Sequence, residues 1–425
     1  MAERRPPGPF RPQAWRSPLR GPWLTSVLGA VLLVGMPILI VTGLLSYVAY
    51  GPQFGQALPP DVGWLRPPTF PWPTRPVWLY RLNQGVHVVL GLVLIPVVLA
   101  KLWSVIPRLF AWPPVRSPAQ ALERASLALL VGSILFEIVT GVLNVQYYYA
   151  FPFSFYTAHY YGAWVFIGAF VAHVTIKLPA MLRGLRSRSL RAELRTPTSE
   201  PEPPDPDGLV DPDGLVAPDP RPATMSRRAV LGLVGGGSLL VAAVTVPQHV
   251  DGPLRSVALL LPRGLRYGEG PNDFQVNKTA EAAGITPART GAGWRLTLLG
   301  GPRPVELDRA ALLALPQHDE TLPIACVEGW STTQTWRGVR LRDLAALAGV
   351  PRPASAFVAS VQETGPFRSA VLARNQVLDP KSLLAVGVNG AELSLDHGFP
   401  ARVIVPALPG VHNTKWVGLI EFRAV

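Results

Sequence analysis

The chain has 425 residues, of which 48% are hydrophobic and only 16% are charged, and its formal net charge is +12. Soluble domains usually carry about 25% charged residues, so this composition argues against a wholly soluble protein. The 47 prolines are too many for a pure helical bundle, and the single cysteine excludes an internal disulfide framework and any metal site built from several cysteines.

Five apolar stretches predict membrane-spanning helices, because each approaches or exceeds the ~20 residues that cross a bilayer as a helix. The fifth stretch is short and rich in glycine, so it is the weakest of the five. The stretches cover about 22–49, 79–106, 122–145, 155–181 and 229–246.

Basic residues are concentrated in the N-terminal tail and in the connections after the second and fourth stretches, whereas the connection over about 146–154 has none. The positive-inside rule then predicts a cytoplasmic N-terminus and an extracytoplasmic C-terminal part. This topology explains the excess positive charge, and we expect membrane lipid but no nucleic acid as a partner. The predicted parts are a cytoplasmic tail (1–21), a four-helix membrane domain (22–181), a Pro- and Asp-rich cytoplasmic linker (182–225), a fifth helix (226–247) and an outer domain (250–425).

Three histidines lie inside the apolar stretches: His87 in the second, and His159 and His173 in the fourth. An ionisable residue within a membrane helix is a candidate functional residue. His159 and His173 are 14 residues apart, which places them ~21 Å apart along a helix and on roughly the same face. The depths of His87 and His159 match, so they could both bind the iron of one b-type haem. Hydrogen bonding within the bundle, or proton handling, is the alternative for all three.

The four-helix segment resembles the cytochrome b subunits of membrane formate dehydrogenases and nickel hydrogenases over about residues 22–181. In that family two histidines 14 apart on the fourth helix serve two haems, with partner histidines on the first and second helices. The first-helix position falls near 21–23, where this chain has no histidine. The resemblance therefore implies one haem b at His87 and His159, and a possible second haem at His173.

The fifth stretch begins with Ser226-Arg227-Arg228, which resembles a twin-arginine export signal. The alternative is an ordinary basic flank of a membrane helix. Beyond it, short β-branched runs and turns rich in Pro and Gly predict an α+β domain, with strands near 294–299, 357–361 and 402–405 and a short helix over 339–349. We expect His249 and His318 to be exposed loop residues.

Cys326 begins the sequence Cys-Val-Glu-Gly-Trp-Ser in this domain. A lone cysteine is either a small buried hydrophobic residue, a nucleophile or a metal ligand. This segment resembles the molybdenum-binding segment of the sulfite oxidase family, which includes the catalytic subunit of periplasmic methionine sulfoxide reductase. The resemblance implies that the Cys326 thiolate binds molybdenum, which is also held by molybdopterin.

Three further segments carry the same resemblance in the same order, over about 268–425. Residues 271–276 resemble the family's entry loop, 397–406 its His/Asn-Gly-x-Pro-x-Arg strand, and 410–416 the segment that closes on the pterin phosphate. Arginine, lysine and amide groups suit a phosphate chemically. The implied cofactor-binding residues are Asn272, Gln275, Val276, His397, Arg402, Asn413 and Lys415.

Together these features predict a membrane-bound molybdenum oxidoreductase that passes electrons between quinone, haem b and a molybdopterin centre. The expected reaction is the reduction of a small S-oxide or N-oxide by quinol. Two alternatives stay open: sulfite-type oxidation of an oxyanion that delivers electrons to quinone, and a metal-free, membrane-anchored binding or sensor module. Because both redox parts lie on one chain, a separate redox subunit is not required.

Overall fold

The computed structural model describes residues 8–11, 14–57, 65–113, 115, 117–197, 200–203, 207, 211, 213–217, 219–260 and 268–424. Contacts divide the chain into two compact units. The helical unit comprises 1–40, 89–142 and 158–243, and the mixed unit comprises 41–88, 143–157 and 244–425. The boundary passes through several helices, so the C-terminal part of α1 and the N-terminal part of α2 belong to the mixed unit.

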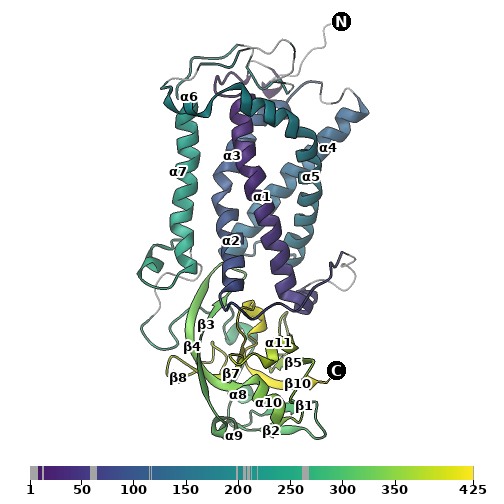
Figure 1. Ribbon diagram of the computed structural model, residues 1–425, viewed down its shortest axis with the longest axis vertical. Helices are drawn as coiled ribbons and strands as arrows, with labels where there is room; N and C mark the ends of the chain where they lie inside the picture. Colours follow the sequence, from purple (N-terminus) through teal and green to yellow (C-terminus); the bar gives the residue numbers. More distant parts are fainter. Residues whose placement is uncertain are drawn as a thin grey trace. The chain divides into compact units, whose positions relative to one another are not determined.

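Long helices form most of the N-terminal half (Figure 1). Five segments are long and apolar enough to cross a membrane, which confirms the predicted number. The second of them consists of two helices rather than one. Leu94 separates them, because Pro96 at the start of α3 cannot donate a backbone hydrogen bond. The helices are α1 (Pro22–Tyr50), α2 (Leu79–Val93), α3 (Ile95–Leu109), α4 (Pro118–Val145), α5 (Phe155–Ser187), α6 (Leu190–Arg195) and α7 (Arg227–Thr245).

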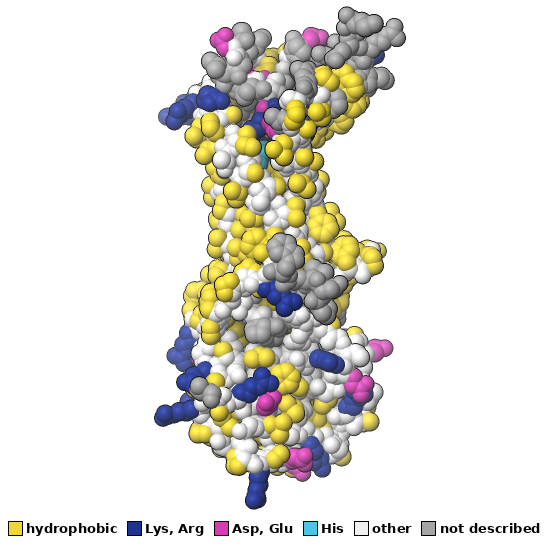
Figure 2. Space-filling view, turned by 90° about the vertical axis from the view of Figure 1, so that its right-hand side faces the viewer, with side chains coloured by type: hydrophobic (Ala, Val, Ile, Leu, Met, Phe, Trp, Pro, Cys, Tyr) yellow, Lys and Arg dark blue, Asp and Glu magenta, His cyan; other side chains and the backbone are white. Residues whose placement is uncertain are grey.

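The helical unit has a small core around Trp23, Leu28 and Phe166 and leaves many large apolar side chains exposed. Leu233 and Leu239, for example, are 70% and 72% exposed. On the face shown in Figure 2, hydrophobic side chains cover most of the helical part. Such a surface suits a lipid environment, where apolar side chains face hydrocarbon rather than water.

Helices α5 and α6 extend to Arg195, and among the described residues of 196–224 there is no helix or strand. Two of them are nevertheless buried, Glu202 and Leu215. The first arginine of the twin-arginine pair is also completely buried. Arg227 donates hydrogen bonds to the carbonyls of Leu19 (3.2 Å) and Pro18 (3.0 Å), so it fixes the start of α7 within the helical unit.

The C-terminal part of the mixed unit is an α+β domain, as predicted, with two five-stranded sheets. One sheet has the order β2-β1-β10-β5-β6. In this sheet β1 and β10 are parallel, and all other neighbouring strands are antiparallel. The other has the order β3-β4-β7-β8, with β9 paired to β7. The strands are β1 (Leu296–Leu299), β2 (Val305–Leu307), β3 (His318–Ala325), β4 (Ser331–Arg340), β5 (Ser355–Ser360), β6 (Ser369–Ala373), β7 (Leu383–Val388), β8 (Ala391–Glu392), β9 (Arg402–Ile404) and β10 (Val417–Arg423).

Short helices connect several of the strands. The predicted helix over 339–349 is present as α10, although it begins later and ends earlier than predicted. The α-helices of this part are α8 (Pro287–Thr290), α9 (Arg309–Ala314), α10 (Leu341–Leu347) and α11 (Arg374–Leu378), and the 3₁₀ helices of the chain are η1 (Gly8–Phe10), η3 (Gly51–Ala57), η4 (Val246–His249), η5 (Pro253–Val257), η6 (Glu281–Ala283) and η7 (Gly410–His412).

The expectation for His249 is wrong. This histidine is buried, and its ring packs against Gly85 of α2, where an added Cβ would lie 3.3 Å from Nδ1. A glycine in α2 provides the space, and the sequence around His249 carries no sign of that distant partner.

Candidate functional site

Cys326 opens the hairpin loop between β3 and β4. Ala325 and Ser331 are paired across the hairpin, the Cys326 N–H donates to the Trp330 carbonyl (2.9 Å), and Gly329 supplies a positive φ of 84°. This loop places the sulfur in a fixed, buried position. Burial raises the pKa of the Cys326 thiol well above its ordinary value, and the nearby Glu328 carboxylate adds to the rise. A metal cation would have to displace that proton to bind the thiolate.

The Cys326 side chain borders a cleft of about 340 Å³. The cleft draws its residues from segments that are far apart in the sequence. Among the predicted site residues, the structure brings Gln275, His397, Arg402 and Lys415 to the same cleft as Cys326. The residues that line it are Phe274, Gln275, Asn277, Ile324, Cys326, Trp330, Thr332, His397, Arg402, Gly410 and Lys415.

Arg402, at the start of β9, is a buried cation in this cleft. Its guanidinium donates to the carbonyls of His397 (3.1 Å) and Asn413 (3.2 Å). No ion pair with Arg402 occurs among the described residues. Burial lowers the pKa of Arg402 to about 9, because the charged guanidinium loses contact with water. The site is therefore built to receive an anion.

Several buried polar atoms around Arg402 also have no hydrogen-bond partner within the described part of the chain. Buried polar groups are nearly always paired in native proteins, so a cluster of unpaired ones indicates a missing polar ligand. Most of these atoms are donors, which suits a ligand rich in acceptor oxygens. They are Gln275 Nε2, Arg402 Nε, Asn413 Nδ2 and Thr414 Oγ1.

Lys415 contributes a second positive charge, and its ammonium is fixed by two backbone carbonyls, those of Lys278 (2.8 Å) and Asp396 (2.7 Å). His397 stacks on Phe274 with ring centroids 3.7 Å apart, and its Nε2 lies 2.8 Å from the Asn272 carbonyl. Burial and the two nearby cations lower the pKa of His397 to about 3, so its ring is neutral at physiological pH.

Asn272, Val276 and Asn413 do not line the cleft. The Asn272 amide donates to the Glu392 carbonyl (2.9 Å) and its oxygen accepts from the Ser394 N–H (2.8 Å). Asn272 therefore fastens the 271–276 loop to the segment that carries His397. Thr414 is buried beside this site with an unpaired hydroxyl, and the sequence analysis did not single it out among residues 410–416.

His87 lies in the mixed unit, with its Nδ1 3.1 Å from Thr42 Oγ1 of α1. An added Cβ on Gly43 would lie 3.1 Å from His87 Cε1, so a glycine makes room for the imidazole. Metal-binding histidines usually have one ring nitrogen held by a hydrogen bond while the other binds the metal. The Thr42 contact fits this pattern when Nδ1 carries the proton.

His159 lies in the helical unit, and its Nδ1 faces a carboxylate. Glu137 Oε2 of α4 is 2.9 Å away and Thr140 Oγ1 is 3.2 Å away. Gly162 leaves space for this carboxylate, since an added Cβ there would collide with Glu137 Oε1. The arrangement is a carboxylate–histidine pair of the kind that orients metal ligands. The sequence did not identify Glu137, because its spacing from His159 follows from the packing of α4 on α5.

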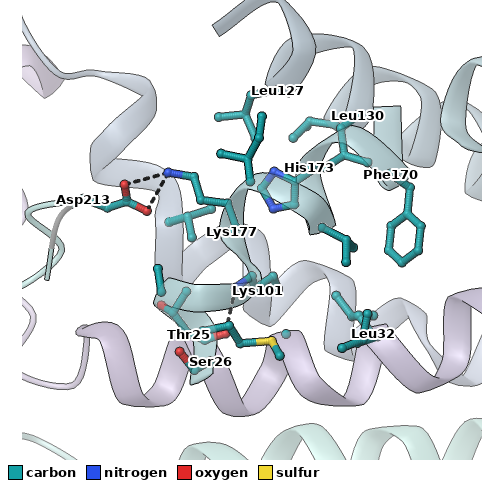
Figure 3. Close-up of a pocket in the computed structure, with 18 of the residues that line it drawn as sticks. Thr25, Ser26, Leu32, Lys101, Leu127, Leu130, Phe170, His173, Lys177 and Asp213 are labelled. Atoms are coloured by element: carbon teal, nitrogen blue, oxygen red, sulfur yellow. Dashed lines mark hydrogen bonds and ion pairs between the residues drawn. The ribbon is translucent and has the colours of Figure 1, made fainter. Parts of the chain in front are cut away.

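His173 borders a large cavity inside the helical unit, with an empty volume of about 1530 Å³ that includes its open side. Figure 3 shows Asp213, Lys177 and Lys101 on one side of His173 and Leu130, Phe170 and Leu32 on the other. Lys101 donates to the Thr25 carbonyl (2.7 Å), and Lys177 is 2.9 Å from Asp213. The cavity therefore has a charged end, with both cations and carboxylates, and an apolar end.

Comparison with known proteins identifies the C-terminal part. Residues 283–425 match the oxidoreductase molybdopterin binding domain family. The chain is 32% identical over 159 residues to mitochondrial sulfite oxidase of Rattus norvegicus, covering 31% of this chain and 29% of that enzyme. It is 34% identical over 131 residues to the uncharacterized oxidoreductase YuiH of Bacillus subtilis, covering 30% of this chain and 65% of that protein.

A longer match is found with the protein-methionine-sulfoxide reductase catalytic subunit MsrP of Gluconobacter oxydans, at 29% identity over 224 residues, 48% of this chain and 70% of that subunit. The C-terminal part is thus a molybdopterin domain of the sulfite oxidase family, as its motifs predicted. The chain spans less than two thirds of the sulfite oxidase and YuiH proteins that it matches.

Proposed function

We propose that this protein is a membrane-bound molybdenum oxidoreductase that exchanges electrons between quinone, haem b and a molybdopterin centre at Cys326. The observation that carries the proposal is the cleft at Cys326, where a buried thiol meets a buried arginine that has no ion pair among the described residues, together with the unpaired donors of Gln275 and Arg402. This donor set fits an anionic, oxygen-rich cofactor that also offers a metal to a thiolate.

The residues have distinct tasks in this proposal. Cys326 holds the metal, while Arg402, Lys415 and the Asn413–Thr414 segment neutralise and hydrogen-bond the anionic part of the cofactor. Bound molybdenum supplies two-electron oxygen-atom transfer, and the protein supplies position and electrostatics. Trp330, held by a hydrogen bond from its indole N–H to Glu328 (2.8 Å), packs beside the sulfur and limits access by water.

His87 and His159 are the proposed axial ligands of one haem b. Support comes from their surroundings, because each ring has its Nδ1 beside a polar group and a glycine next to it. A haem bound there supplies single-electron transfer. The membrane orientation proposed from the basic connections places the molybdopterin domain outside the cytoplasm.

The cavity at His173 is the proposed quinone site, with a second haem as the alternative occupant. Its apolar end suits a hydrophobic tail, and Lys101 and His173 suit the carbonyl oxygens of a quinone head group. Lys177 and Asp213 form a charged connection next to it, through which the protein can exchange protons with the quinone site.

Reduction of an S-oxide or N-oxide is the proposed direction, because the chain matches a protein-methionine-sulfoxide reductase catalytic subunit over 224 residues. Sulfite-type oxidation is the second candidate, which the match to mitochondrial sulfite oxidase favours. The two differ in the response of the haem. If the haem of the purified, dithionite-reduced protein is oxidised by methionine sulfoxide or trimethylamine N-oxide, reduction is supported. In the oxidised protein, reduction of the haem by sulfite would instead support sulfite-type oxidation. No response of the haem to any of these substrates would refute the proposal.

A further inference from the structure

We propose that one face of α2 is a docking seam for the cysteine loop, defined as residues 326–330, and that Gln84 and Asn144 are the residues that position this loop for electron exchange with the haem at His87. The inference rests on the proposed function and adds the place where the two redox parts meet. All contacts described below lie within the mixed unit.

The seam follows the helical repeat of α2. Residues 81, 84, 85 and 88 share one face of a helix, and each of them contacts the molybdopterin domain or the segment that leads into it. Arg81 donates to the His249 carbonyl (2.8 Å) and to Thr333 Oγ1 (3.0 Å). Gly85 packs against the His249 ring. His87 stands on the same turn as Val88, at the end of this face.

Two side-chain amides converge on a single backbone carbonyl of the cysteine loop. Gln84 Nε2 of α2 lies 3.3 Å from the Val327 carbonyl oxygen, and Asn144 Nδ2 of α4 lies 3.1 Å from it. A carbonyl oxygen has two lone pairs, so one oxygen can accept both bonds. Val327 directly follows Cys326, and the two amides therefore fix the metal-binding loop from two different membrane helices.

Both amides are themselves held in orientation. The Gln84 oxygen accepts hydrogen bonds from Ser46 (2.8 Å) and Tyr80 (3.2 Å), and the Asn144 oxygen accepts one from Tyr149 (3.0 Å). With their oxygens engaged in this way, the NH₂ groups point to the Val327 carbonyl. Such a preorganised pair of donors positions a loop more closely than a mobile surface contact does.

Val88 makes a second direct contact between α2 and the cysteine loop. An added Cβ on Gly329 would lie 2.6 Å from Val88 Cγ1, so the glycine backbone packs closely on this valine. The route from His87 to Cys326 therefore follows covalent bonds except for one non-bonded contact, between Val88 and Gly329. Electron transfer slows much more across a gap than along bonds, so the seam controls the rate by keeping this contact closed.

The test uses the full-length protein with Gln84→Leu, Asn144→Leu and the double variant. We expect unchanged haem and molybdenum content, and unchanged substrate reduction with reduced viologen, which supplies electrons to the molybdenum site directly. Stopped-flow reoxidation of the pre-reduced haem by substrate should be at least tenfold slower in the double variant. Gln56→Leu is the matched control, because it removes an amide bond to the Ser369 carbonyl (2.9 Å) away from the loop.

Hydrogen exchange provides a readout that does not depend on activity. Backbone amides of residues 326–330 should exchange about tenfold faster in the double variant than in the wild type or in Gln56→Leu. Wild-type exchange and wild-type haem reoxidation in the double variant would overturn the inference. Equal losses of viologen-driven and haem-driven turnover would also overturn it, since they would show a general defect of the molybdenum site. Failure of the proposed function is distinguishable, because the wild-type haem would then not respond to substrate at all.

Discussion

Replacement of Arg402 by methionine should change stability in opposite directions with and without cofactor. Burial lowers the pKa of Arg402 from its ordinary range to about 9, which corresponds to about 5 kcal/mol of unfavourable charge burial in the cofactor-free protein. The substitution removes this cost but leaves the His397 and Asn413 carbonyls without their donor, at roughly 1–3 kcal/mol each. With about 2 kcal/mol for each carbonyl, the middle of that range, we expect cofactor-free Arg402→Met to be about 1 kcal/mol more stable than the cofactor-free wild type.

The assay is thermal unfolding of both proteins, each isolated from a host that makes molybdopterin and from one that does not. Domains of this size shift by roughly 2–4 °C for each kcal/mol, so the cofactor-free variant should melt a few degrees above the wild type. The cofactor-loaded variant should melt lower or bind no molybdenum. Arg423→Met, which breaks an exposed pair with Glu421, should change neither form. A variant that melts lower in both forms would refute the anion-site reasoning, because Arg402 would then serve only the fold.

Three further predictions concern the histidines and the cavity. Glu137→Gln should keep the haem and raise its midpoint potential by on the order of 60 mV, which is a tenfold change for one electron. The reason is that a neutral amide replaces the carboxylate beside His159. An unchanged potential in a redox titration would show that Glu137 does not act on a haem ligand. Lys101→Met should abolish haem reduction by quinol but not by dithionite, and normal quinol reduction would remove the quinone site from this cavity. Burial lowers the pKa of His412 to about 4, so as the pH falls this histidine binds a proton in the unfolded protein before it does so in the folded protein. The stability of the protein should therefore fall as the pH drops from about 6.5 to 4. In melting curves, His412→Gln should reduce this dependence of the melting temperature on pH, and an equal dependence would show that His412 is not its source.

The architecture follows closely from sequence patterns, because membrane spans and β-branched strands are local signals. The division of the second span at Leu94 was visible only as a proline in an apolar run, and such a run tolerates either a kink or a break. The linker was predicted from its Pro- and Asp-rich composition, but burial of Leu215 depends on packing within the helical unit, which composition does not encode.

The site could be predicted only where residue type and order carry the chemistry. Cys326 and Arg402 stand in motifs, and the structure brings them to one cleft. Asn272 stands in a motif as well, yet its side chain binds backbone groups of another loop. Glu137 and Gln84 could not be found in this way, because their partners His159 and Val327 are set by the packing of separate segments.

The central claim is that the sulfur of Cys326 binds molybdenum. Metal analysis combined with molybdenum X-ray absorption on the purified full-length protein tests it most directly, with Cys326→Ser as the comparison. The wild type should contain molybdenum with one more sulfur ligand than the variant, and both should retain haem. A wild-type protein without molybdenum, or with the same sulfur coordination as Cys326→Ser, would contradict the account.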